Sequence, residues 1–152
     1  MYTERCEAAL PSLLSERLYG VPPRRVTGIW ANARSFGDGD AACVSCCPHL
    51  ESLLISDTAV SDVFLGSIPP LNAVRWMSLD NTRVTDAGIR QLAKHKRLRV
   101  LMLSGTGVTN DGFEFICSSL PELQVIDVSS TAVSDEAICR VQARYSSLGV
   151  IK

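Results

Sequence analysis

Residues 74–86 read VRWMSLDNTRVTD, and the same arrangement of apolar and polar residues returns at a nearly constant interval along the chain. The first apolar residue of each unit recurs in steps of 24, 24, 24, 25 and 25 residues, at Val26, Leu50, Val74, Leu98, Leu123 and Leu148. A period between about 20 and 50 residues is typical of stacked repeats, in which each unit buries its apolar face against its neighbours. The sequence therefore predicts a solenoid, and we expect function on the surfaces that stacking creates.

Each unit combines two periodicities. Met77 and Leu79 alternate with polar residues, which predicts a short strand with one buried face. Thr85-Asp86 then precedes an apolar helical spacing, and a hydroxyl or carboxylate at that place caps the first N–H groups of a helix. The buried helical pairs are predicted to be Leu65/Ile68, Ile89/Leu92, Phe113/Ile116 and Ile138/Val141. Because connections between parallel strands are right-handed, we predict an α/β right-handed solenoid of about five strand–helix repeats of 24–25 residues plus a terminal strand.

The repeated pattern L-x-x-L-x-L-x-x-T-x-V-[ST]-[DN] resembles the leucine-rich repeat. It is similar to the ribonuclease-inhibitor-like and cysteine-containing subtypes, with Thr where the family more often has Asn or Cys, at Thr58, Thr82, Thr106 and Thr131. The resemblance covers roughly residues 26–151. It implies the leucine-rich-repeat fold and a general recognition scaffold, and it names no partner.

Two regions are predicted. Residues 1–22 form an N-terminal capping helix region, because Leu10, Leu13, Leu14 and Leu18 fall at helical spacing, and residues 23–152 form the leucine-rich-repeat domain. An alternative for the first region is a docking helix or an F-box-like element, which Leu10-Pro11 followed by Leu13-Leu14 faintly resembles.

Composition limits the classes of function. The formal net charge of -1 argues against nucleic-acid binding driven by the field of the whole molecule. No apolar run approaches the length of a membrane span, so none is expected. The first residues, with Glu4 and Glu7, lack the apolar core of a secretory signal. Six cysteines without such a signal favour an intracellular, reducing compartment, either cytoplasmic or mitochondrial.

The strand face turned away from the helices is the first candidate site. Alternation points both tryptophans outward, and we predict that they form one apolar band with their neighbours. The predicted partner-binding residues are Trp30, Leu54, Trp76, Val100, Met102, Val125 and Asp127, within a polar rim of Asn32, Ser56, Asp80, Ser104 and Ser129. Trp and Met are enriched at interface cores, so a protein partner is expected. The alternative is that a terminal segment of the same chain covers the band.

A second candidate is a cysteine cluster, Cys43, Cys46 and Cys47, followed by His49. Thiolates and an imidazole are zinc ligands, but a structural zinc site usually has two such knuckles and no second C-x-x-C is present. We therefore expect thiols packed in a short helix, with no metal and no cofactor.

A third candidate is the basic run around His95, formed by Lys94, Lys96, Arg97 and the nearby Arg99. Basic side chains at a helix C-terminus suit the helix dipole, so a solvated face is expected. The functional alternative is a local contact with RNA, phosphate or an acidic protein surface.

Catalysis is not expected. No Gly-rich phosphate loop has the required spacing, and Ser/Thr-Asp pairs that recur in four repeats favour caps over a single active site. The sequence predicts a non-catalytic protein–protein interaction module that binds on its concave strand face. The alternatives are a structural or accessory subunit of a large assembly, for example mitochondrial or ribonucleoprotein, and an F-box-like adaptor for protein turnover. Partner or self-pairing is also predicted at the C-terminal edge strand around Leu148–Ile151.

Overall fold

The computed structural model describes residues 26–31 and 36–152. The predicted capping helix of residues 1–22, the F-box-like stretch and Asn32 lie outside the described residues. In the described part, no helix is both long and apolar enough to span a membrane.

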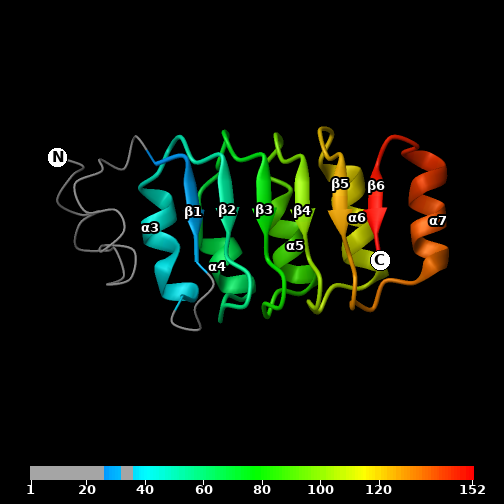
Figure 1. The fold of residues 1–152 in the computed structure, drawn as a ribbon, viewed down its shortest axis with the longest axis horizontal. Coiled ribbons are helices and arrows are strands. Elements are labelled where there is room, and N and C mark those ends of the chain that lie inside the picture. Colours follow the sequence, from blue (N-terminus) through cyan, green and yellow to red (C-terminus); the bar gives the residue numbers. More distant parts are fainter. Residues whose placement is uncertain (1–25, 32–35) are drawn as a thin grey trace.

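Six short parallel strands form one sheet in sequence order, β1-β2-β3-β4-β5-β6 (Figure 1). Their bounds are β1 Gly28–Trp30, β2 Ser52–Leu54, β3 Trp76–Ser78, β4 Val100–Met102, β5 Val125–Asp127 and β6 Gly149–Ile151. A helix follows each of the first five strands, with bounds α3 Ala41–Ser45, preceded by a 3₁₀ turn η2 at Asp38–Asp40, α4 Asp62–Ser67, α5 Asp86–Leu92, α6 Asn110–Ser119 and α7 Asp135–Arg144. The predicted alternation of strands and helices is confirmed.

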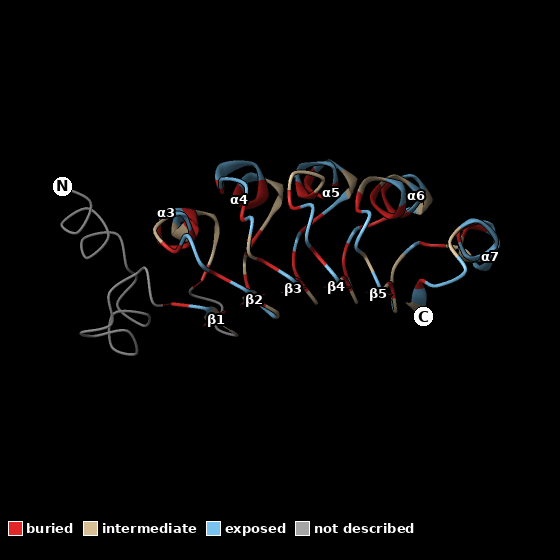
Figure 2. Ribbon diagram, turned by 90° about the horizontal axis from the view of Figure 1, so that it is seen from above, coloured by how far each residue is buried: buried red, intermediate tan, exposed pale blue. Residues whose placement is uncertain are grey.

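The helices lie on one side of the sheet, along the outside of a shallow arc whose inner side is the row of strands (Figure 2). The core fills the space between the two layers. Strand residues that face the helices are at most 2% exposed from β1 to β5, namely Ile29, Leu53, Met77, Leu101 and Ile126. The predicted helical pairs belong to the same core, and all of their residues are buried except Ile138, which is partly buried. The opposite surface of the sheet, turned away from the helices, is called the concave strand face below.

The final strand shows where the sequence-based register was wrong. The spacing of the apolar anchors placed Ile151 inward, in the position of Ile126. The observed register pairs Ile126 with Val150 and Asp127 with Ile151, so Ile151 faces outward and is 46% exposed. A shift of one residue moves every side chain of a strand to the other face. The interval from β5 to β6 is thus 24 residues, although the spacing from Leu123 to Leu148 is 25.

The Ser/Thr-Asp pairs join consecutive repeats as well as starting the helices. Ser61, Thr85 and Ser134 accept hydrogen bonds from main-chain N–H groups of their own helices, as predicted for caps. The acidic residue after Ser61 and the one after Thr85 instead accept hydrogen bonds from the next repeat. Asp62, for example, accepts from the N–H and the hydroxyl of Thr85, at 2.8 and 2.6 Å. The prediction that the carboxylate caps its own helix is replaced by a bond that staples neighbouring repeats.

Two glycines let the helices come close to these acids. A Cβ atom at Gly88 would lie 2.3 Å from Oδ1 of Asp62, and one at Gly112 would lie 2.1 Å from Oδ1 of Asp86. The equivalent position of α7 is Ala137, whose methyl group does not fit that approach. Consistent with this, α7 stands apart from the row formed by α4, α5 and α6 (Figure 2).

The threonines at the family's Asn or Cys position bond within their own repeats. Thr58, Thr82 and Thr106 are buried, and each hydroxyl donates to the main-chain oxygen three residues earlier, at 2.6–2.7 Å. These bonds give each strand-end carbonyl group a donor, and the carbonyl oxygen of Leu103 also accepts from the N–H of Thr106. The hydroxyl therefore turns the chain out of each strand without any link to the next repeat.

Candidate partner-binding surface

The outward residues of the sheet form two parallel rows. One row, through Trp76, contains Gly28, Ser52, Trp76, Val100, Val125 and Gly149. The other, through Trp30, contains Trp30, Leu54, Ser78, Met102, Asp127 and Ile151. The single band predicted from the sequence is thus divided between two rows, because the two tryptophans occupy different positions of their strands.

Both tryptophans point outward, as predicted. Trp30 is 62% exposed and Trp76 is 50% exposed, the largest apolar side chains so exposed in the described part of the chain. The four predicted neighbours of these tryptophans are half-buried: Leu54, Val100, Met102 and Val125. The apolar surface therefore runs the length of the sheet, with its most accessible part over β1 to β3.

The indole of Trp30 folds back along its own strand. A Cβ atom at Gly28 would lie 3.0 Å from Cζ2 and 3.1 Å from Cη2 of Trp30, so the six-membered ring covers the glycine. Gly28 and Trp76 belong to the same row, with Ser52 between them. Because adjacent strands are about 4.8 Å apart, Gly28 and Trp76 lie about 9.6 Å apart in this row. A side chain at position 28 would require the Trp30 ring to move by a few tenths of an ångström.

A network of hydroxyl groups and one carboxylate lies at the carboxyl end of β2 and β3. Ser78 donates to Oδ2 of Asp80 at 2.8 Å, and Ser56 lies 2.6 Å from the Ser78 hydroxyl. The other oxygen of Asp80 accepts from the N–H of Ser104 at 2.8 Å. Ser78 is buried although it belongs to the outward row through Trp30, and its hydroxyl is engaged in this network. The bonds fix a negative charge at the edge of the apolar surface.

The amino ends of the strands carry paired charges. Arg75 lies 3.7 Å from Glu51, and Arg99 lies 3.4 Å from Glu122, so each pair joins adjacent repeats. Asp127 accepts from the N–H of Ser129 and, within the described residues, forms no ion pair. The uncompensated charge of the concave strand face is thus negative, at Asp80 and Asp127.

The basic run around His95 has a structural function. Lys94 donates to the carbonyl oxygens of Leu65 and Ile68, at 2.9 and 2.5 Å, and so caps the C-terminal end of α4. Burial lowers the pKa of Lys94. Lys96 reaches the other way, to the carbonyl oxygen of Ser119 on α6 at 3.0 Å. The two lysines are therefore engaged with neighbouring repeats, whereas Arg97 is exposed and forms no ion pair within the described residues.

His95 is fully buried, although its charged neighbours in the sequence predicted a solvated corner. Its Nδ1 atom accepts from the N–H of Leu71 at 3.0 Å, which joins two repeats. Its Nε2 atom has no hydrogen-bond partner. Burial, with Lys94 adding a smaller effect, lowers the pKa of His95 to about 4. The ring is thus a neutral core residue at ordinary pH.

The cysteine candidates do not converge. Cys43 and Cys47 are buried in and after α3, whereas His49 is exposed. Burial raises the pKa of Cys43 to about 11 and that of Cys117 to about 12, so these thiols stay protonated. Cys46 is held in a disulfide. In the described residues, no group of three or more His, Cys, Asp or Glu side chains is placed to hold a metal ion.

The prediction of a reducing compartment stays a prediction, and the disulfide at Cys46 does not favour it, because disulfides are rare in cytosolic proteins.

Comparison with solved structures identifies the fold as that of leucine-rich-repeat proteins. A leucine-rich-repeat protein of Leptospira interrogans is 19% identical, with a TM-score of 0.53, over 74% of this chain and 27% of that one. The leiomodin-1 actin-binding site 2 is 12% identical, with a TM-score of 0.51, over 94% of this chain and 82% of that one. An internalin of Listeria monocytogenes is 16% identical, with a TM-score of 0.48, over 74% of this chain and 37% of that one.

This chain thus spans about a quarter of the length of the Leptospira protein. No protein-family model and no curated protein matches the sequence. At these identities the likeness establishes the fold, without selecting a subtype of the repeat.

Proposed function

We propose that this leucine-rich-repeat chain is a non-catalytic module that binds a protein partner on its concave strand face. The observation that carries the proposal is the exposure of Trp30 and Trp76 on a surface whose supporting residues are buried. Each Trp presents on the order of 150–250 Å² of surface, and Trp is among the side chains that dominate interface energies.

The support beneath the tryptophans is rigid. Ile29 and Met77, which flank them in sequence, are 2% and 0% exposed. The Trp30 ring already rests on Gly28, so part of its rotational freedom is lost before any partner arrives. Preorganised anchors of this kind reduce the entropy lost on binding, so a modest surface gives useful affinity.

The chemistry of the surface selects the partner. An apolar side chain of the partner placed over Ser52 would lie between the Trp30 ring, which covers Gly28, and Trp76. Asp80 and Asp127 favour a basic residue beside it, because they are the uncompensated charges of the face. We therefore expect a protein partner that presents an apolar or aromatic side chain next to Lys or Arg.

One structural neighbour offers a precedent for the class of function. The leiomodin-1 segment is described as an actin-binding site, and it aligns with most of this chain. That description belongs to leiomodin-1. It supports the proposal only in that a chain of this fold and size serves there as a protein-binding element.

The experiment is an affinity purification from the native source with the wild type and with a Trp30→Ser, Trp76→Ser double variant. Val63→Ser is the matched control, since Val63 on α4 is 64% exposed but lies outside the concave strand face. We expect the double variant to lose one or more partners that the control retains, with circular dichroism melts showing both folded. A partner list unchanged in the folded double variant would contradict the proposal.

A separate hypothesis concerns a second surface, the edge of β6. β6 pairs with β5 on one side only within the described residues, and Ile151 is exposed beside that edge. Lys152 bonds to Asp135 there, at 2.5 Å. Partner or self-pairing at this edge stays a hypothesis, which fails if removal of residues 147–152 leaves both the partners and the oligomeric state unchanged.

A further inference from the structure

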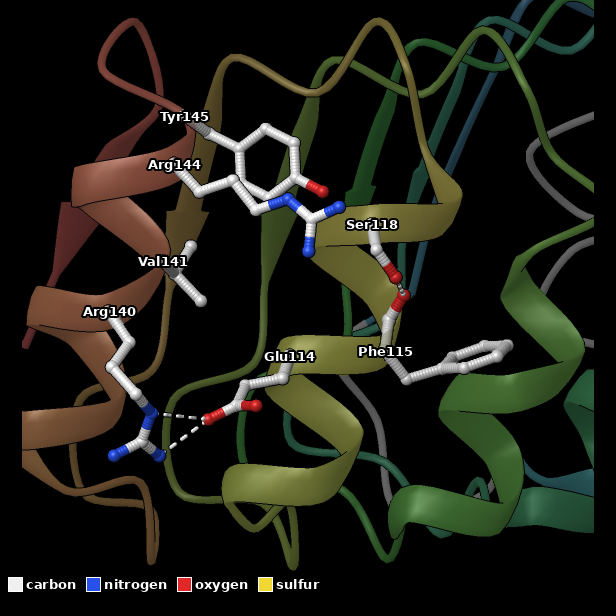
Figure 3. Close-up of a pocket in the computed structure, with 7 residues that line it drawn as sticks. All are labelled: Glu114, Phe115, Ser118, Arg140, Val141, Arg144 and Tyr145. Atoms are coloured by element: carbon white, nitrogen blue, oxygen red, sulfur yellow. Dashed lines mark hydrogen bonds and ion pairs between the residues drawn. The ribbon is translucent and has the colours of Figure 1, made fainter.

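A groove of about 450 Å³ lies between α6 and α7, on the helical side of the solenoid (Figure 3). It is separate from the concave strand face, on which the proposed function depends. Its volume falls within the range of about 300–1,000 Å³ that small-molecule sites usually have. None of its lining residues was a candidate in the sequence.

The groove follows from a break in the repeat. Gly88 and Gly112 bring α5 and α6 against the acids of the preceding helices, and Ala137 replaces them in α7. The staple is also weaker here, because Asn110 accepts only one bond from the next repeat, from the N–H of Ser134 at 2.8 Å. α7 therefore stands off from α6, and Arg140, Val141 and Arg144 line the opening between the two helices.

The walls of the groove are partly apolar. Val141 points into it from α7, and Tyr145 closes its end (Figure 3). Val141 is 5% exposed and Tyr145 is partly buried against the core, so both are fixed in place. The groove thus offers a firm apolar wall on the α7 side.

The charges of the groove do not cancel. Arg140 bonds to Oε1 of Glu114 through Nη2 at 2.6 Å and through Nε at 3.2 Å, which neutralises that pair. Arg144 lies over the ring of Tyr145, 5.6 Å from its centroid, and forms no ion pair within the described residues. Its guanidinium extends across the groove toward Ser118 on α6 (Figure 3). One positive charge with free donors therefore stands over an apolar wall.

We propose that the groove between α6 and α7 binds a small organic anion, whose carboxylate meets the guanidinium of Arg144 and whose aromatic or aliphatic body lies against Val141 and Tyr145. A planar guanidinium matches a carboxylate through two parallel hydrogen bonds. The Arg140–Glu114 pair closes the other end of the groove, and because the two charges neutralise each other it offers no free cation to a second anionic group. The ligand class is thus a monoanion with one apolar end.

The test uses naphthalene-2-carboxylate as the probe, with naphthalene-2-carboxamide and inorganic phosphate as comparison ligands, and measures binding to the full chain by titration NMR up to 5 mM. We expect the carboxylate to bind with a dissociation constant on the order of 0.1–1 mM. The carboxamide and phosphate should each bind at least about tenfold more weakly, because the carboxamide lacks the negative charge and phosphate lacks the apolar body. Equal binding of the carboxylate and the carboxamide, or no binding of either, would overturn the proposal.

Two variants locate the site. Arg144→Gln should raise the dissociation constant of naphthalene-2-carboxylate by about tenfold or more, as expected for loss of a charged hydrogen-bond partner. Arg97→Gln is the matched control, since Arg97 is also exposed and forms no ion pair within the described residues, but does not line the groove. Ser118→Trp, at an exposed position, should block the opening and abolish binding. An equal effect of the two arginine variants, or none from Arg144→Gln, would contradict the site.

Discussion

Asp62 at the start of α4 holds Thr85 at the start of α5 through two hydrogen bonds, one to the main-chain N–H and one to the hydroxyl. Asp38 makes the same pair of bonds to Ser61, and Asp86 makes it to Thr109. A line of carboxylates thus joins the helix starts of consecutive repeats. A repeat is stable only when it packs against its neighbours, so the stability of a solenoid depends on the interfaces between repeats. These bonds strengthen those interfaces.

Replacement of Asp62 by Ala should lower the free energy of unfolding by about 1–2 kcal/mol, because two charge-assisted hydrogen bonds are lost at a partly exposed site. Asp62→Asn should cost less, since its amide oxygen still accepts from the N–H, as Asn110 does. Urea unfolding measures both. Asp111→Ala is the control, because Asp111 is exposed in the same kind of first helical turn and forms none of these bonds. A loss as large for Asp111→Ala would show that the staple contributes nothing beyond the helix dipole.

The same change, Gly to Ala, should have opposite effects in two helices. Gly112→Ala should destabilise by about 1–2 kcal/mol, because the new methyl group would displace Asp86 from Thr109. Gly66→Ala in α4 should stabilise by about 0.5–1 kcal/mol, since nothing lies within 4 Å of its Cβ position and alanine favours the helix. Thermal or urea unfolding of the two variants decides. Stabilisation by both would mean that α6 does not depend on close approach to Asp86.

Much of this architecture was predictable from the sequence, and the reasons for the misses are local. The buried pairs Ile89/Leu92 and Phe113/Ile116 could be predicted from their spacing alone, because apolar residues three apart in a helix lie on the same face and that face packs against the core. The staple at Asp62 did not follow, since a Ser/Thr-Asp pair is equally compatible with capping its own helix. The sequence does contain one sign of the staple, a glycine two residues after Asp86 and another two residues after Asn110. A glycine at this position of a helix leaves room for the carboxylate of the preceding repeat.

The candidate surface was predicted in outline. The outward direction of Trp30 and Trp76 follows from strand alternation. Their division between two rows is contained in the same spacing, since Trp30 lies four residues after Val26 and Trp76 two residues after Val74. The fold of Trp30 over Gly28 depends on a rotamer, which the pattern does not contain. Sequence also gave no indication of the groove at Arg144, because it arises from the spacing of two helices that the Ala137 methyl group sets.

His95 should make stability depend on pH. Its pKa is lowered to about 4 in the folded protein, against an ordinary value near 6.5, so the unfolded chain binds more protons between these values. Its contribution is full above pH 6.5 and is lost as the pH falls toward 4. From pH 6.5 to pH 5 the loss should be about 2 kcal/mol, in a range where most carboxylates remain ionised.

The matched variant for this effect is His95→Asn, whose amide oxygen can accept from the Leu71 N–H but does not titrate in this range. Urea midpoints between pH 7 and pH 5 should fall for the wild type and stay nearly level for the variant. A parallel decline in both proteins would assign the pH dependence to other groups.

The lysines beside His95 should affect stability and not polyanion binding. Lys94→Met removes both donors to the end of α4 while keeping an unbranched apolar chain, so we expect a loss of about 1–2 kcal/mol. Arg97→Met, at the exposed position of the same run, should change stability by less than about 0.5 kcal/mol. Heparin binding, measured on the same variants, distinguishes a structural role of the basic run from a contact with a polyanion. If Lys94→Met weakened heparin binding and left the unfolding free energy unchanged, the lysine would face a polyanion instead of the carbonyl groups of α4.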